Sequence, residues 1–198
     1  RCSRDWSSDV CSSDLDNPNW LDVLEWGPEA ASAGWFDIEW DSDHRYLHGK
    51  ILVPFLGDQY GVELDAGRLQ LRFDEEAGSF AVWAYDVHRL PICPLDYDSL
   101  LWNHPELERL GDSFADLGAW RPDVARRAGE LKAELAGLAA ADSAARSAIA
   151  RRMARFNGVP GDPESWEALD HLITKQSWRA AHFRTARSEE HTSELQSR

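Results

Sequence analysis

The sequence contains little cysteine, little positive charge and no long apolar run. Its 198 residues include 3 Cys, and 21 Lys and Arg against 35 Asp and Glu, which gives a net charge of −14 at pH 7. An acidic chain repels phosphate backbones and anionic lipid headgroups, so nucleic-acid binding and membrane-surface binding are not expected. No apolar stretch approaches the roughly 20 residues that a membrane-spanning helix needs.

The two ends of the chain do not resemble evolved protein sequence. DNA strings that are reverse complements of each other, and that form a common short-read sequencing adapter, encode DWSSDVCSSDL (5–15) and RSEEHTSELQS (187–197). We therefore interpret residues 1–15 and 187–198 as processing scars and expect neither to pack. Residues 16–186 are then an insert, expected to be an internal fragment, and their net charge is −12 because each scar carries −1.

Within the insert, Cys93 is the single cysteine. One cysteine cannot close an internal disulfide, which favours a reducing, cytoplasmic setting. Cys93 has His88 five residues before it, but nothing in the sequence places a base beside the thiol, so a cysteine nucleophile is not expected.

Tryptophan, in contrast, is abundant, with 10 in the chain. Flat aromatic rings pack against the C–H faces of sugars, so an acidic chain rich in Trp is consistent with a neutral carbohydrate ligand. Trp is also a large core residue, and core packing explains most individual tryptophans. The insert contains Trp20, Trp26, Trp35, Trp40, Trp83, Trp102, Trp120, Trp166 and Trp178.

The first half of the insert is typical of short strands. A short helix is predicted over 19–26, followed by a half-buried strand at 36–41, where apolar and acidic residues alternate. Residues 50–55 form an apolar run, and 68–88 contain two alternating segments around the turn DEEAG, which predicts a β-hairpin.

These strands predict a β-rich subdomain over 35–94, after a helix and loop at 16–34. We expect residues 35–92 to form one compact antiparallel sheet with Leu69, Leu71 and Phe73 on a shared face. The sheet region should end at Pro91 and Pro94, because proline cannot donate to a sheet ladder.

The second half of the insert is helical. Residues 95–155 contain two helical apolar stripes that predict an αα-hairpin. Because the surface that they would cover is expected to be largely missing, we predict that these stripes are exposed, at Leu131, Leu135, Ile149 and Met153. Residues 156–186 predict a rigid Gly- and Pro-rich loop, a last helix and a strand at 177–185.

Residue types that could carry catalysis are present but poorly arranged. Asp37, Glu39 and Asp41 share one strand face, which could be an acid/base or metal site, yet a solvent-facing edge explains them better. His44 and His48 lie in a loop without a third ligand at zinc spacing. There is no glycine-rich phosphate loop and no nucleophile elbow, and we expect neither a metal nor a cofactor.

Several strings together resemble one family, the maltooligosyltrehalose synthases of the α-amylase superfamily (glycoside hydrolase family 13). Any one string is weak, but the five occur in the same order as in the family. They are NPNWLDVLEWGPEA (17–30), WFDIEW (35–40), LHGKILVPFLGDQYGVELDAGRLQLRFD (47–74), YDVHRLPI (85–92) and FNGVPGDPESWEALDHLITKQSWRAAHFR (156–184).

The resemblance implies an α+β piece of a (β/α)₈ barrel enzyme, made of a β-rich subdomain and helices. Family members are isomerases of trehalose biosynthesis that convert the reducing-end α-1,4 linkage of a maltooligosaccharide to α,α-1,1 without a cofactor. The resemblance places the family's catalytic carboxylates after Ala186 and before Asp16, so the chain itself is expected to be inactive. It implies substrate contacts for His88, Arg89, Asn157, Asp162 and Arg184. One departure is Ala180–Phe183 (AAHF), where the family has a bulkier strand.

Two alternatives remain. Another α-amylase-type hydrolase or glucanotransferase would share the same carboxylate logic, and its products would separate it from a synthase. A non-catalytic glucan-binding module would instead fold autonomously and bind maltooligosaccharide without turning it over.

Overall fold

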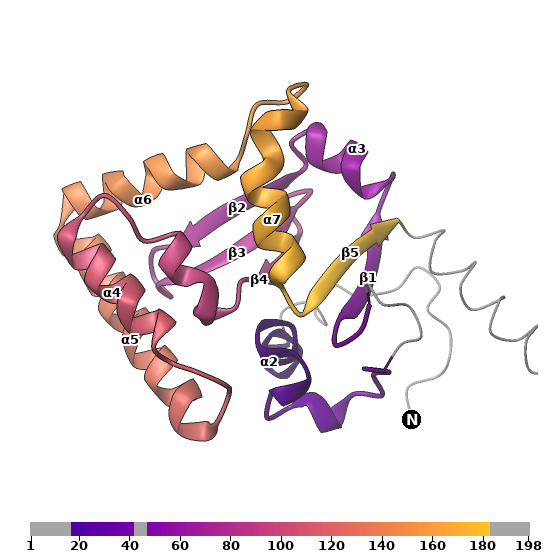
Figure 1. Cartoon of the computed structure of the whole chain (residues 1–198), viewed down its shortest axis with the longest axis horizontal. Coiled ribbons are helices and arrows are strands. Elements are labelled where there is room, and N and C mark those ends of the chain that lie inside the picture. Colours follow the sequence, from indigo (N-terminus) through magenta and orange to yellow (C-terminus); the bar gives the residue numbers. More distant parts are fainter. Residues whose placement is uncertain (1–16, 42–46, 183–198) are drawn as a thin grey trace, which may run out of the picture.

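The described part of the chain contains two separate β-sheets joined by helices (Figure 1). The computed structural model describes residues 17–41 and 47–182. The end segments 1–15 and 187–198, interpreted as scars, lie outside the described residues, and so do Arg184 and His44.

The first sheet is a parallel pair of strands from opposite ends of the described chain. Strand β1 (Ile51–Leu56) pairs with β5 (Trp178–His182), with Val53 opposite Ala180. Parallel strands need a crossover connection, and here everything between residues 56 and 178 makes it, including the second sheet. The run 50–55 therefore does not join an antiparallel sheet with its sequence neighbours. The prediction that 35–92 forms one such sheet was wrong at this strand.

The second sheet is antiparallel, in the order β2–β3–β4, with strands β2 (Leu69–Asp74), β3 (Ser79–Ala84) and β4 (His88–Pro91). The predicted hairpin over 68–88 is confirmed as β2 and β3. The second strand of the hairpin ends at Ala84, and a third strand, β4, follows the turn. Leu69 and Leu71 lie buried on the shared face as predicted, and Phe73 extends it by packing its ring against Phe80, with centroids 4.9 Å apart.

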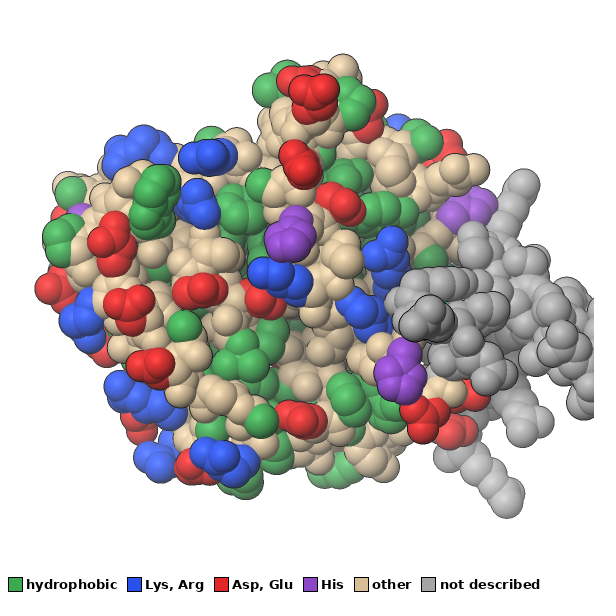
Figure 2. Space-filling model, viewed as in Figure 1, with side chains coloured by type: hydrophobic (Ala, Val, Ile, Leu, Met, Phe, Trp, Pro, Cys, Tyr) green, Lys and Arg blue, Asp and Glu red, His purple; other side chains and the backbone are tan. Residues whose placement is uncertain are grey.

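Helices cover this sheet and form the left side of the molecule in Figure 1. After the 3₁₀ helix η3 (Pro94–Ser99) come α4 (Pro105–Ala115), α5 (Pro122–Ala141) and α6 (Ser143–Phe156). The predicted αα-hairpin is α5 and α6, separated by Asp142, whose side chain caps α6. Acidic and basic side chains are interspersed over this helical side (Figure 2).

The apolar stripes of this helical hairpin are buried, not exposed as predicted. The relative exposures of Leu131, Leu135, Ile149 and Met153 are 1%, 0%, 2% and 9%. The stripes belong to one continuous core, because α4 packs on α5 while β2 and α7 (Glu167–Lys175) pack on α6. The chain thus supplies its own cover for these helices.

The N-terminal segment is confirmed in part. Helix α2 (Pro18–Trp26) begins at Asn17, whose side chain accepts a hydrogen bond from the Asn19 N–H. Residues 36–40, however, are not a strand, although Phe36, Ile38 and Trp40 are partly buried and the residues between them are exposed. The alternation predicted the burial of these residues correctly, but the segment pairs with no strand among the described residues.

Two side chains at the start of β5 connect the two sheets. The Trp178 indole is fully buried and donates to the Pro91 carbonyl of β4 at 2.8 Å. The buried Gln176 amide accepts from the Cys93 N–H at 2.8 Å and donates to Asp96 and to the Leu172 carbonyl. These contacts fix the parallel pair against the end of the antiparallel sheet.

Candidate functional site

The strongest candidate site lies at the carboxyl end of β1, where the turn between β3 and β4 meets it. We define the β1-end cluster as Phe55, Gly57, Glu63, Tyr85 and His88. In α/β proteins with parallel strands, ligands commonly bind outside the carboxyl ends of the strands.

His88, a substrate contact predicted from the sequence, belongs to this cluster. It begins β4 and stacks on Phe55 of β1, with ring centroids 4.6 Å apart and 26° between the planes. Its Nδ1 is buried and has no hydrogen-bond partner within the described residues. Burial lowers the pKa of the imidazole below its ordinary value, which favours the neutral ring. A buried nitrogen without a partner is rare in folded proteins, so His88 is a candidate for a role beyond packing.

Tyr85 approaches the cluster from the turn between β3 and β4. Tyr85 and Asp86 have φ of 53° and 61°, the positive values that a tight hairpin turn with two left-handed residues needs. For a bulky residue such as Tyr this conformation is strained. The Tyr85 hydroxyl accepts the Gly57 N–H at 2.7 Å, which fastens the turn to the end of β1.

Glu63 supplies a buried carboxylate. It lies in the short helix α3 (Tyr60–Asp65), its side chain is 0% exposed, and Arg68 Nη1 contacts both oxygens at 3.2 and 3.1 Å. A methyl group built on Gly57 would lie 3.4 Å from the Tyr85 hydroxyl and 3.5 Å from Glu63 Oε1, so both oxygens converge over this glycine. Burial raises the pKa of the Tyr85 hydroxyl, and the Glu63 carboxylate raises it further.

The cluster therefore combines an aromatic face with hydroxyl, imidazole and carboxylate groups. That combination suits the recognition of a sugar, which presents C–H faces and many hydroxyls. Glycosidic chemistry uses two carboxylates. The cluster contains one, Glu63, which is already paired with Arg68.

Arg89 lies on the opposite face of the sheet from His88, because neighbouring strand residues alternate. Its guanidinium donates to the Ser79 hydroxyl at 3.2 Å and lies 3.9 Å from Asp74. On the same face, Arg72 lies over the Trp83 ring at 5.6 Å. Arg89 thus belongs to a second polar face and not to the β1-end cluster.

Asn157 and Asp162 have different surroundings. The Asn157 amide accepts from the Leu71 N–H at 2.7 Å and donates to the Leu71 carbonyl at 2.8 Å, which continues the ladder beyond β2. Asp162 is exposed and forms its contacts through its backbone, with its N–H bonded to the Val159 carbonyl. Sugar contact by these two residues, as by Arg184 outside the described residues, stays a prediction.

Apart from Gly57, which contributes its backbone N–H, three members of the β1-end cluster were missed from the sequence. The sequence pattern does not distinguish Glu63 from any other acidic residue of a short amphipathic segment. Tyr85 carries no signal for a left-handed turn, which usually takes Asn, Asp or Gly. Phe55 lies in an apolar run that gives no hint of which ring will meet His88, 33 residues later.

Other classes of site were sought in the described residues. In residues 17–41 and 47–182, no three His, Cys, Asp or Glu side chains are grouped as metal ligands would be. Across the same residues, none of the helices has the length and apolar character to cross a membrane. Comparison of the chain with protein-family models, curated proteins and solved structures finds no match.

Proposed function

We propose that the chain is part of an enzyme of the maltooligosyltrehalose synthase type, an isomerase of trehalose biosynthesis. Such an enzyme moves the reducing-end glucosyl linkage of a maltooligosaccharide from α-1,4 to α,α-1,1. The five ordered sequence strings are the ground for the family, and the chain would act in the cytoplasm, without a cofactor, on a neutral glucan.

One structural observation carries the proposal. A long insertion containing an antiparallel sheet separates two parallel strands, and its His88 returns to the carboxyl end of the first strand. A (β/α)₈ barrel with an inserted subdomain over its active-site face has this arrangement. In this proposal β1 and β5 are barrel strands, and the β1-end cluster contacts the glucan.

Catalysis would belong to carboxylates that the resemblance places outside residues 16–186. Removing the nucleophile and the acid/base residue abolishes nearly all rate enhancement in enzymes of this kind. We therefore expect the 198-residue chain to form no trehalose-capped product from maltooligosaccharides. Product formation above background would contradict this division of roles.

The binding role can be tested separately from activity. Titration with maltohexaose, followed by amide and indole resonances, should shift the signals of residues around Phe55 and His88. His88→Ala should weaken binding by about tenfold, the effect of a hydrogen bond and a ring face lost together. Glu164→Ala, at an exposed position that was not predicted to contact sugar, serves as the control. Equal weakening by both variants would remove the β1-end cluster from the proposal.

The family assignment has its own test. Genomic DNA that continues past codon 186 should encode a barrel strand with a nucleophilic Asp. A continuation without such a strand would overturn the assignment, whatever the binding titration gives.

One observation favours a second candidate, the non-catalytic glucan-binding module. The apolar stripes of α5 and α6 are covered within the chain and belong to one core, as a self-sufficient module requires. A monodisperse monomer with a two-state melt that binds maltohexaose, together with flanking DNA lacking the nucleophile strand, would establish it in place of the enzyme.

A further inference from the structure

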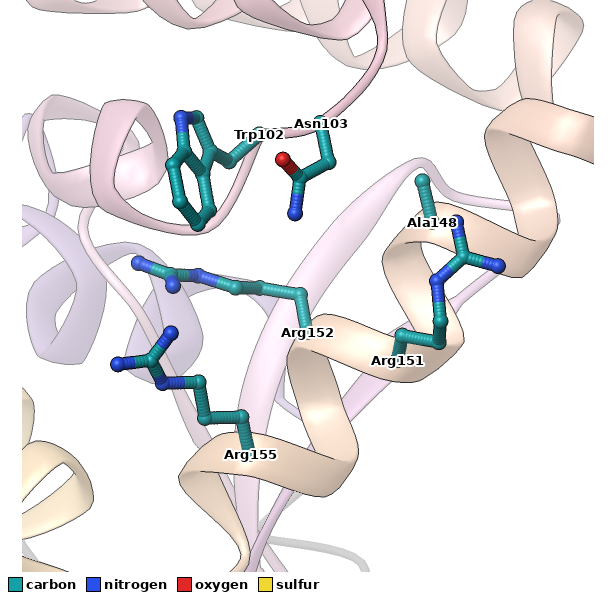
Figure 3. Close-up of a pocket in the computed structure, with 6 residues that line it drawn as sticks. All are labelled: Trp102, Asn103, Ala148, Arg151, Arg152 and Arg155. Atoms are coloured by element: carbon teal, nitrogen blue, oxygen red, sulfur yellow. The ribbon is translucent and has the colours of Figure 1, made fainter.

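A hollow of about 100 Å³ lies between helix α6 and the loop that precedes α4 (Figure 3). We call it the arginine hollow, and its lining residues are Trp102, Asn103, Ala148, Arg151, Arg152 and Arg155. The β1-end cluster shares no residue with it.

Arg152 is the fixed member of the hollow. Its Nε and Nη2 both donate to the Ser99 carbonyl, at 2.9 and 2.5 Å, and its guanidinium lies 5.4 Å from the Trp102 ring centroid. The same guanidinium also lies over the Phe156 ring, 5.0 Å from its centroid, so two aromatic rings contact it. The positive charge is thus held in place by a carbonyl and two ring faces, without a carboxylate.

Two further guanidinium groups lie beside it. In Figure 3, Arg155 points to the same side of α6 as Arg152, toward Trp102, whereas Arg151 points toward Ala148. Within the described residues neither Arg151 nor Arg155 forms an ion pair or a hydrogen bond. Burial lowers the pKa of Arg152, and the nearby positive charge of Arg155 lowers it further.

In the part of the chain that the structure describes, the arginines of the hollow have no carboxylate partner, whereas arginines of helix α5 in the same acidic chain do. There, Arg126 and Arg127 both contact Glu130, each at 3.1 Å. Near the hollow, the Glu108 carboxylate accepts a hydrogen bond from the backbone N–H of Asn103 at 3.2 Å, and it does not contact the arginines within the described residues. The guanidinium groups of Arg152 and Arg155 therefore lie close together, with Arg151 on the neighbouring wall, and a bound anion would neutralise their charge.

We propose that the arginine hollow binds an oxyanion of the phosphate class. Planar guanidinium groups donate paired hydrogen bonds to phosphate oxygens, and Arg152 is already held in place by the Ser99 carbonyl before an anion binds. Arg152 supplies the fixed charge, Arg155 closes on the anion from the next turn of α6, and Asn103 offers an amide. This site is independent of the proposed glucan contacts.

Inorganic phosphate is the probe for the test, titrated into the full chain at constant ionic strength. The Trp102 indole N–H resonance, assigned by its loss in Trp102→Phe, should shift along a saturable curve. Arg155→Gln should weaken binding by about tenfold, as expected for the loss of a charge-assisted hydrogen bond. Arg155→Lys, which keeps the charge but loses the planar fork, should give an intermediate affinity.

Arg126→Gln is the matched control, because it removes the same charge from an exposed position of α5. It should change the phosphate affinity by less than twofold. Equal weakening by Arg126→Gln and Arg155→Gln would show that the whole field of the chain attracts phosphate, and would overturn the proposal. A linear, non-saturable response of the indole to phosphate would overturn it too.

A second arm identifies the source of the oxyanion. If a hexose phosphate binds more than tenfold tighter than inorganic phosphate, while the neutral hexose does not bind, the ligand is a phosphorylated sugar. Equal affinities for the two phosphates identify free phosphate. Either result supports the oxyanion site, and binding of the neutral hexose alone contradicts it.

Discussion

The side chain of Asn157 bonds to both backbone groups of Leu71, 86 residues before it in the sequence. Leu71 lies in β2, the edge strand of the antiparallel sheet, and the amide occupies the position that another strand would take. This one side chain fixes the loop after α6 to the sheet edge and satisfies a buried N–H and carbonyl.

Asn157→Ala should therefore destabilise the fold. Both Leu71 groups would lose a partner while Leu71 stays buried, so we expect a loss of about 1–3 kcal/mol in the free energy of unfolding. Urea denaturation followed by circular dichroism measures it. Asp162→Ala, in the same loop but exposed, should change the free energy by less than about 0.5 kcal/mol. Similar values for both variants would contradict a structural role for Asn157.

The parts of the fold that the sequence predicted are those set by local pattern. Helix α2, the hairpin of β2 and β3 and the last helix and strand follow from apolar periodicity and from caps or turns within a few residues. The pairing of Ile51 with Trp178 could not be predicted in this way, because no local pattern specifies a partner that distant. The segment 36–40 shows the converse, since its alternation predicted burial without a strand.

Part of the candidate site could be predicted because a family resemblance pointed to it. His88 came from that resemblance, and the structure places it against Phe55. Tyr85 and Glu63 could not be found, because their roles depend on a strained turn and on the return of α3 over Gly57. The buried stripe of α5 and α6 was predicted as exposed, since the sequence did not show that β2 and α7 would cover it.

The tip of the hairpin rests on α5, and Gly78 makes that contact. A methyl group at Gly78 would lie 1.9 Å from the Lys132 carbonyl oxygen, and its φ is +60°. Gly78→Ala should cost on the order of 3 kcal/mol, from backbone strain and overpacking together. Thermal denaturation should show a lowered melting temperature, and a value like that of the unmodified chain would contradict the contact.

A second glycine offers the opposite expectation as a control. Gly129 is exposed in the middle of α5, and a methyl group there meets nothing within 4 Å. Because Ala is the better helix former, Gly129→Ala should stabilise by about 1 kcal/mol. The pair of variants separates a steric effect at Gly78 from any general effect of replacing glycine.

Cys93 should be a slow-reacting thiol in the folded chain. Burial is the main cause that raises its pKa to about 12, so the thiol is almost entirely protonated at pH 8. In a background with Cys2→Ser and Cys11→Ser, a thiol-specific reagent should label Cys93 slowly at pH 8 and rapidly in denaturing urea. Rapid labelling of the folded chain would show that the packing around β4 and Gln176 is wrong.

The stability of the fold should depend on pH through His88. Burial lowers its pKa in the folded state below the value of about 6.5 that an unfolded chain gives. Between those two values the unfolded state binds more protons, so the free energy of unfolding falls as the pH drops below about 6.5. His88→Phe keeps a ring against Phe55 but cannot ionise, so its free energy of unfolding should fall less between pH 8 and pH 5.

Asn157→Ala should lower the curve without changing its slope, since it removes no ionisable group. Urea titrations at each pH provide the comparison, and parallel curves for His88→Phe and the unmodified chain would mean that the imidazole of His88 is solvated and free to ionise.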